Sequence, residues 1–115
     1  MNRHAHCFFC DDIRFEVGEK TSLMGIYGGE LNVSECPAIL PKICISAFMR
    51  TEASQPLKTL TIRLNYKGSI IQEQEVPTDQ LKAIQEQLVN RGTPEDPIQH
   101  FSIGCNIALS PFLID

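Results

Sequence analysis

The densest group of potential metal ligands in this sequence consists of His4, His6, Cys7 and Cys10, close to the N-terminus. A structural zinc site needs four nitrogen or sulfur ligands in a tetrahedron, and a Cys-x-x-Cys pair normally supplies two of them from a tight turn. Here two phenylalanines separate the cysteines and indicate a strand, in which Cys7 and Cys10 point to opposite faces. No second pair of this kind follows. We therefore expect no metal or other cofactor, and these four residues are the candidates if one binds.

Asp11 and Asp12 are candidates for acid–base chemistry or cation binding. Neighbouring residues of a strand face apart, so these carboxylates cannot share a proton as a facing pair does. Asp11 falls on the inward side of the apolar alternation around it. Because buried carboxylates need partners, we expect Asp11 to accept backbone N–H bonds at a bulge or strand crossing, or to pair with Arg14 or Arg50.

Two further catalytic patterns are incomplete. The glycine-rich segment 25–29 lacks the Gly-Lys-Ser/Thr end and the following helix of a phosphate-binding loop. His100 has no neighbouring partner in the sequence that would make it the base for a serine or cysteine nucleophile. The sequence therefore predicts no catalytic residue, and we expect that the chain is not an enzyme.

The composition limits the class of protein further. With 115 residues, 43% of them hydrophobic and 21% charged, the chain suits one packed domain over residues 1–115. Its net charge of −4 and its scattered lysines and arginines argue against nucleic-acid binding. No apolar stretch has the length of a membrane span or a signal peptide, which predicts no membrane contact and a cytoplasmic location. The five cysteines cannot all pair within one chain and are expected to be free thiols.

Alternation of apolar and polar residues predicts the elements that must position these side chains. Residues 5–17 alternate with the odd positions apolar except for Asp11, which predicts a strand with the odd positions buried. An apolar run follows at residues 21–33, and its part 21–31 is the expected hairpin partner. An apolar stripe at helical spacing predicts one helix near residues 79–91, capped by Thr78 or Asp79 and stopped by Gly92. The other expected strands are 43–51, 57–66, 70–76 and 101–109.

Together these elements favour a mainly-β fold, an antiparallel β-sandwich of about six strands with one short α-helix. A core is expected from residues on the apolar faces of the strands: Phe15, Leu23, Ile45, Ile62, Leu64, Ile103 and Ile107. Three consecutive bulky residues near the C-terminus, Phe112, Leu113 and Ile114, would be unfavourable in water. We expect them to dock onto the sheet or onto another chain.

Three segments carry a resemblance: Cys10–Glu16, Ser22–Tyr27 and Pro37–Lys42. With the later Ser110-Pro111-Phe112, they resemble an uncharacterised bacterial and phage family of small β-sandwich proteins. The resemblance implies a sandwich and carries no activity, because the family has none assigned. Similar proteins usually continue beyond the Ser-Pro-Phe element into a further hairpin, whereas this chain stops at Asp115. The resemblance therefore implies an unpaired sheet edge.

These observations favour a non-enzymatic protein-binding or assembly module. An unpaired edge strand or the apolar C-terminus would make it a homodimer or larger oligomer, with Phe112, Leu113 and Ile114 at the contact. One alternative is a phage- or mobile-element-encoded inhibitor or accessory factor that acts on a host protein. Another is a metal- or thiol-dependent enzyme that uses His4, His6, Cys7 and Cys10 of the N-terminal cluster.

Overall fold

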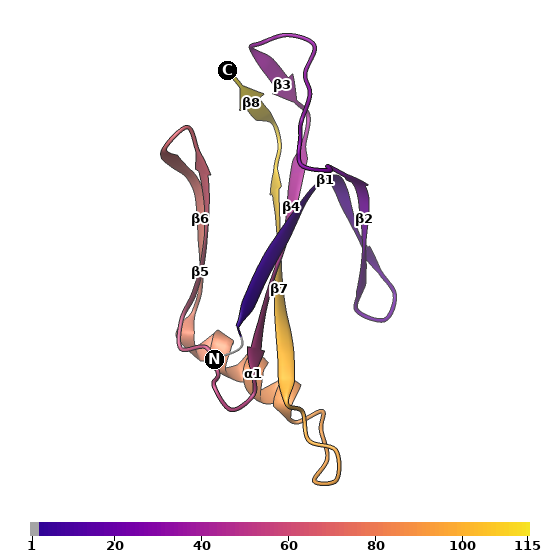
Figure 1. Cartoon of the computed structure of the whole chain (residues 1–115), viewed down its shortest axis with the longest axis vertical. Coiled ribbons are helices and arrows are strands. Elements are labelled where there is room, and N and C mark those ends of the chain that lie inside the picture. The colour runs from indigo at the N-terminus through magenta and orange to yellow at the C-terminus, as the bar shows by residue number, and fades with distance from the viewer. Residues whose placement is uncertain (1–2) are drawn as a thin grey trace. The chain divides into compact units, whose positions relative to one another are not determined.

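The computed structural model describes residues 3–115 and is mainly β, with antiparallel sheets and one helix in that range (Figure 1). Strands β2, β1, β4 and β7 form one sheet in that order, and β3–β8 and β5–β6 form two-stranded sheets. The mainly-β prediction is thus confirmed, whereas the sheets are not closed and a sandwich stays a prediction. The elements are β1 (His4–Glu16), β2 (Lys20–Ile26), β3 (Ala38–Leu40), β4 (Ile43–Glu52), β5 (Leu60–Tyr66), β6 (Ser69–Val76), α1 (Thr78–Val89), β7 (His100–Leu109) and β8 (Phe112–Ile114).

The chain divides into two compact units. Unit 1 comprises Arg3, His4 and Arg50–Ser102, and unit 2 comprises Ala5–Met49 and Ile103–Asp115. Unit 1 holds α1 and the β5–β6 hairpin, and unit 2 holds the β1–β2 hairpin and the β3–β8 pair. The long strands β4 and β7 contribute residues to both units. The expectation of one domain over residues 1–115 stays a prediction.

The hairpin expected at the start of the chain is confirmed in unit 2. β1 pairs antiparallel with β2 from Cys10 opposite Ile26 to Glu16 opposite Lys20. The amide of Tyr27 adds one more bond by donating to the carbonyl of Phe9 at 2.8 Å. Regular pairing ends there, so β2 is shorter than the apolar run 21–33 predicted.

The helix of unit 1 is confirmed, with both ends slightly earlier than expected. Pro77 occupies the N-cap position without a side-chain hydrogen bond, so the predicted caps Thr78 and Asp79 are wrong. At the other end the amide of Asn90 still donates to the carbonyl of Glu86. Beyond it the amide donors reach back only three residues, which tightens the backbone into turns before the loop that leads to β7.

Apolar and polar side chains alternate along β5 as expected. Leu60 is buried and Ile62 and Leu64 are half-buried, while Thr61 and Arg63 between them are exposed. β5 begins three residues later than the sequence predicted, because the Gln85 side chain of α1 bonds the backbone of Leu57. The core predictions that burial confirms are Ile45, Ile103 and Ile107.

No helix within residues 3–115 combines the length and the apolar character needed to cross a membrane.

Candidate functional site

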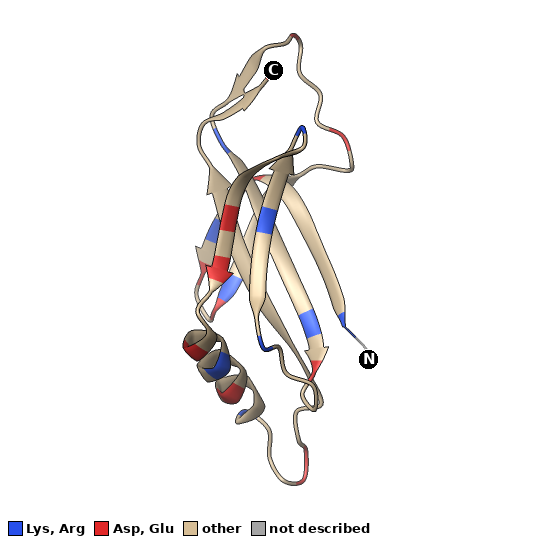
Figure 2. Ribbon diagram, turned by 90° about the vertical axis from the view of Figure 1, so that its left-hand side faces the viewer, with Lys and Arg blue, Asp and Glu red and all other residues tan. Residues whose placement is uncertain are grey.

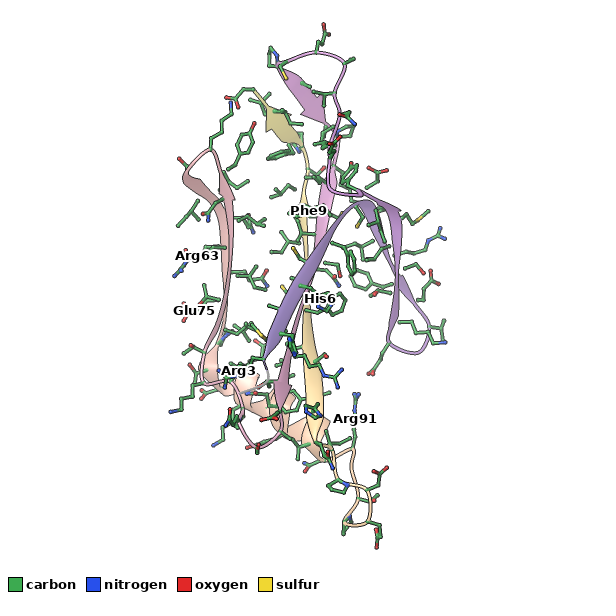
Figure 3. The ribbon with its side chains drawn as sticks, in the orientation of Figure 1. Arg3, His6, Phe9, Arg63, Glu75 and Arg91 are labelled. Atoms are coloured by element: carbon green, nitrogen blue, oxygen red, sulfur yellow. The ribbon has the colours of Figure 1, made fainter. Side chains whose placement is uncertain are left out.

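The N-terminal histidines and cysteines do not converge. His6 stacks on the ring of Phe48 with centroids 5.2 Å apart, Cys7 is exposed and Cys10 is buried. His6 and Phe9 both come from β1 (Figure 3). Within residues 3–115, no three His, Cys, Asp or Glu side chains lie close enough to hold a metal ion. The regular strand separates these side chains, as its alternation predicts.

The two aspartates gather partners from three segments of unit 2. The Tyr27 hydroxyl donates to Oδ1 of Asp11 at 2.5 Å. Oδ1 of Asp12 accepts from Nζ of Lys42 at 2.6 Å and from the amide of Ile13 at 2.9 Å. Asp11 therefore ties β1 to the end of β2, and Asp12 ties β1 to the segment that precedes β4. We name this arrangement of Asp11, Asp12, Tyr27 and Lys42 the aspartate cluster.

The expectation for Asp11 was partly wrong. Its side chain is exposed rather than inward, and it pairs with Tyr27 rather than with Arg14 or Arg50. The hairpin register explains this, because the residues on either side of Asp11 pair with Ile26 and Met24, so the Asp11 side chain lies over Gly25, where β2 offers no side chain. A carboxylate over a glycine is open to water and needs no buried partner.

Gly25 is adapted to that carboxylate in two ways. Its φ of +68° lies in the left-handed region, which favours glycine. A Cβ at this position would also lie 2.8 Å from Cγ of Asp11 and still closer to Oδ2. The glycine therefore makes room for Asp11, and with it for the bond to Tyr27.

Hydrogen bonds within the aspartate cluster stabilise the protonation states that Tyr27, Asp12 and Lys42 ordinarily have at neutral pH. The hydrogen bond to Asp11 raises the pKa of Tyr27 to about 12, so the phenol keeps its proton to a higher pH than an ordinary tyrosine does. The hydrogen bond from Lys42 lowers the pKa of Asp12, and the same bond raises the pKa of Lys42, so both remain charged. Since every member already has a partner, the cluster fits the role of a clamp between segments better than that of an acid–base site.

Two buried cysteines lie beside this cluster. Cys10 on β1 and Cys44 on β4 are both buried, and the Cys44 thiol lies 3.8 Å from the carbonyl oxygen of Asp11. Burial raises the pKa of the Cys10 thiol, and the nearby Cys44 adds to that effect. Burial likewise raises the pKa of Cys105. A nucleophilic or redox thiol needs the opposite shift.

His100 lies in a shallow hollow of unit 1 with a volume of about 420 Å³, which Glu52 and Ser54 also line. Within the described part of the chain no hydrogen bond joins Ser54 to His100. A serine, a histidine and a carboxylate thus share one hollow, but the contact that activates a serine is not made.

The largest departure from the sequence predictions is on the β1–β2 hairpin. Phe15 was expected in the core, yet 74% of its surface is exposed, and Val17 after it is 94% exposed. Phe9 on the same face is 43% exposed. Phe9 and Phe15 are odd positions of β1 and share a face with half-buried Ile13 and its register partner Leu23, and Val17 follows in the turn directly after β1. We name Phe9, Ile13, Phe15, Val17 and Leu23 the open apolar face.

The apolar C-terminal residues dock within unit 2. Phe112, Leu113 and Ile114 form β8, which pairs antiparallel with β3, and the Ser110 hydroxyl donates to the carbonyl of Pro41 at 2.8 Å. Of the three residues, Leu113 is 53% exposed and the others are half-buried. Docking onto the chain's own strand is thus one of the two expected outcomes, and the contact with another chain stays a prediction.

Sequence reasoning missed the two side chains that organise unit 1. Gln85 of α1 is buried; its Oε1 accepts from the amide of Leu57 at 2.7 Å, and its Nε2 donates to the carbonyl of Leu57 at 2.9 Å. Because Leu57 bonds this amide instead of a strand, β5 starts only at Leu60. Arg3 donates to Oγ1 of Thr51 and to the carbonyl of Gln55. The sequence gives no sign that Gln85 bonds the backbone of Leu57, because this role depends on the burial of its side chain in the folded chain.

Beside Gln85 lies a groove between α1 and the segment that connects β4 to β5, with a volume of about 590 Å³. Leu57 and Phe101, both buried, contribute to its lining, and the half-exposed Val89 comes from α1. No spacing in the sequence predicts this groove, since its described lining comes from three separate segments: the β4–β5 connection, α1 with its C-cap, and β7.

Comparison with known proteins finds no matching family, no matching curated protein and no matching solved structure.

Proposed function

We propose that this chain is a non-enzymatic protein-binding module that assembles with a second copy of itself through the open apolar face. The observation that carries the proposal is the exposure of Phe15 and Val17, at 74% and 94%, on the face that the sequence pattern makes apolar. Each square ångström of apolar surface removed from water contributes about 25 cal/mol, so covering such a face favours association.

The low charge of this face is compatible with a second copy as the occupant. The chain carries a net charge of −4, so two copies repel unless they meet on uncharged surface. Asp11 is the one acidic residue on this face of β1, and its carboxylate is hydrogen-bonded to Tyr27. A two-fold contact places the same apolar patch on both sides, so it brings no further like charges together.

The proposal also accounts for the sandwich that the sequence pattern and the family resemblance imply. Two β1–β2 hairpins that stack through their open apolar faces would pack sheet on sheet, as in a sandwich. The sandwich would then form between two chains, and the odd positions of β1 would be buried there as the alternation predicts.

Sedimentation velocity over a range of protein concentrations tests the proposal. We expect a concentration-dependent dimer for the natural chain and a monomer for the double variant Phe15→Ser, Val17→Lys, which changes only exposed positions. Circular dichroism would verify that the variant is folded. A natural chain that stays monomeric at every concentration, or a double variant that still dimerises, would overturn the proposal.

The control variant is Leu113→Ser, which removes an apolar side chain that is 53% exposed from β8 in the same unit. We expect it to dimerise like the natural chain. If Leu113→Ser alone abolishes the dimer, the contact lies at Phe112, Leu113 and Ile114, as the sequence analysis expected, and not at the open apolar face.

The alternatives make different demands on the same face. An inhibitor or accessory factor that acts on a host protein predicts a specific, stoichiometric host partner, which a pull-down from host lysate would reveal. A thiol-dependent enzyme predicts a thiol with a lowered pKa, whereas burial raises the pKa of both Cys10 and Cys105. We therefore favour the non-enzymatic module.

A further inference from the structure

The groove beside Gln85 has the dimensions and the lining of a ligand site. Its volume of about 590 Å³ lies within the range of roughly 300–1,000 Å³ typical of small-molecule sites. Leu57 and Phe101 are buried and supply apolar surface, and Val89 of α1 adds an apolar wall that is 40% exposed. The two bonds between Gln85 and Leu57 fix the helix against this apolar surface before any ligand arrives.

Charge distinguishes this groove from the rest of an acidic protein. Lys58 and Lys82 both line it, and Glu86 is the one acidic side chain in its described lining. Figure 2 shows the mixed charges along α1, where Lys82 lies between the acidic residues Asp79 and Glu86 in the sequence. Within residues 3–115, neither Lys58 nor Lys82 forms an ion pair. Both ammonium groups are therefore available to an anion.

We infer that this groove binds a small amphipathic carboxylate, with its apolar chain on Leu57, Val89 and Phe101 and its carboxylate at Lys58 and Lys82. An ammonium group bonds a carboxylate about twice as strongly as a neutral donor does. The apolar surface selects a chain of several methylene groups, since each one buried contributes about 0.8 kcal/mol. The lining residues of the groove within residues 3–115 all belong to unit 1, so this inference does not depend on the open apolar face or on the proposed dimer.

Isothermal titration calorimetry with decanoate, below its micellar concentration, tests the inference. We expect saturable binding of decanoate, weaker binding of butyrate because it buries fewer methylene groups, and weaker binding of the uncharged decanol. The double variant Lys58→Gln, Lys82→Gln should weaken decanoate binding about tenfold and leave decanol binding unchanged, because only the carboxylate uses the lysines.

The matched control is Lys20→Gln on β2, which removes the same charge from a residue outside the groove. It should bind decanoate like the natural chain. A second variant, Val89→Asp, places a carboxylate on the apolar wall at a half-exposed position that tolerates a polar side chain, and it should abolish decanoate binding. Amide chemical shifts on titration should move at Leu57 and Val89.

Three outcomes would overturn the inference. They are the absence of decanoate binding, equal affinity of the natural chain and the double lysine variant, and shift changes confined to residues outside the groove lining. Equal affinity for decanoate and decanol would also overturn the role given to Lys58 and Lys82, because an apolar groove alone would then account for binding.

Discussion

Gln85 in unit 1 and Asp11 in unit 2 both hold a neighbouring segment by side-chain hydrogen bonds, but in different surroundings. The Gln85 amide is 6% exposed, and both of its ends bond the backbone of Leu57. The Asp11 carboxylate is exposed and bonds the Tyr27 hydroxyl. Water can replace the lost partner at Asp11 but not at Gln85. The buried amide should therefore contribute far more to stability than the exposed cluster, although the exposed cluster contains the charges.

The largest effect is expected at Gln85. Gln85→Ala leaves the amide and carbonyl of Leu57 buried without partners and opens a cavity, so it should lower the free energy of unfolding by about 2–4 kcal/mol. Urea denaturation measures this. Gln87→Ala, at an exposed position of the same helix, should change stability by no more than about 0.5 kcal/mol. Equal effects of the two substitutions would contradict the stabilising role given to the hydrogen bonds between Gln85 and Leu57.

Gly25 tests how tightly Asp11 is placed. Gly25→Ala should cost about 2–3 kcal/mol, from its positive φ together with the clash against Asp11. Gly68→Ala is the matched control, since Gly68 has a φ of +80° and open space around it, so it should cost only about 1 kcal/mol. When Asp11→Ala is also present, Gly25→Ala should cost no more stability than Gly68→Ala, because the clash is then removed. If the additional cost persists, Gly25 is required because of its backbone conformation and not because of Asp11.

The pH dependence of Tyr27 tests the bond that Asp11 accepts. Its folded pKa of about 12 lies above the ordinary value of 10.0, so the protonated phenol stabilises the folded chain below pH 10. That contribution should be lost as the pH rises from 10 towards 12. Phenolate absorbance in a Tyr66→Phe background reports Tyr27 alone. Asp11→Asn should bring its pKa down towards the ordinary value, and an unchanged titration would show that Asp11 is not the cause.

The smallest effect is expected at the ion pair of Lys42 and Asp12, whose side chains are 43% and 48% exposed. Lys42→Gln should lower the urea midpoint slightly at low salt and not at all at high salt, because surface pairs are screened. The lowered pKa of Asp12 means that the pair stabilises the fold at neutral pH, and that this contribution is lost in acid. Arg63→Gln, which removes the exposed pair with Glu73, should behave alike. A salt-independent loss at Lys42 would show that the cluster is a stronger clamp than its exposure indicates.

Local patterns predicted the elements well where one face of a strand or helix repeats. The alternation in β1, β5 and β7 and the apolar stripe of α1 predicted those elements to within a few residues. The short strands β3 and β8 were missed, because three residues are too few for a periodic pattern. Caps of α1 were also missed, since Pro77 fixes the start by its own φ and the hydroxyl of Thr78 is not used.

The candidate sites were predicted less well than the fold. The three segments quoted for the family resemblance contain Asp11, Asp12, Gly25, Tyr27 and Lys42, yet nothing in their spacing shows that they meet. The groove beside Gln85 was not predicted at all, because its lining comes from segments that only the folded chain brings together. Contacts between segments far apart in sequence depend on strand register, which local patterns do not specify.

By itself the sequence determined that this chain is mainly β, where its long strands and its helix lie, and which side of β1 is apolar. These features follow from backbone geometry, which alternates side chains in a strand and repeats them every few residues in a helix. Only the tertiary structure decided that Phe15 and Val17 are exposed, that Tyr27 meets Asp11, and that Gln85 holds Leu57. Burial and partner choice are properties of the assembled chain, because they depend on what the other segments cover.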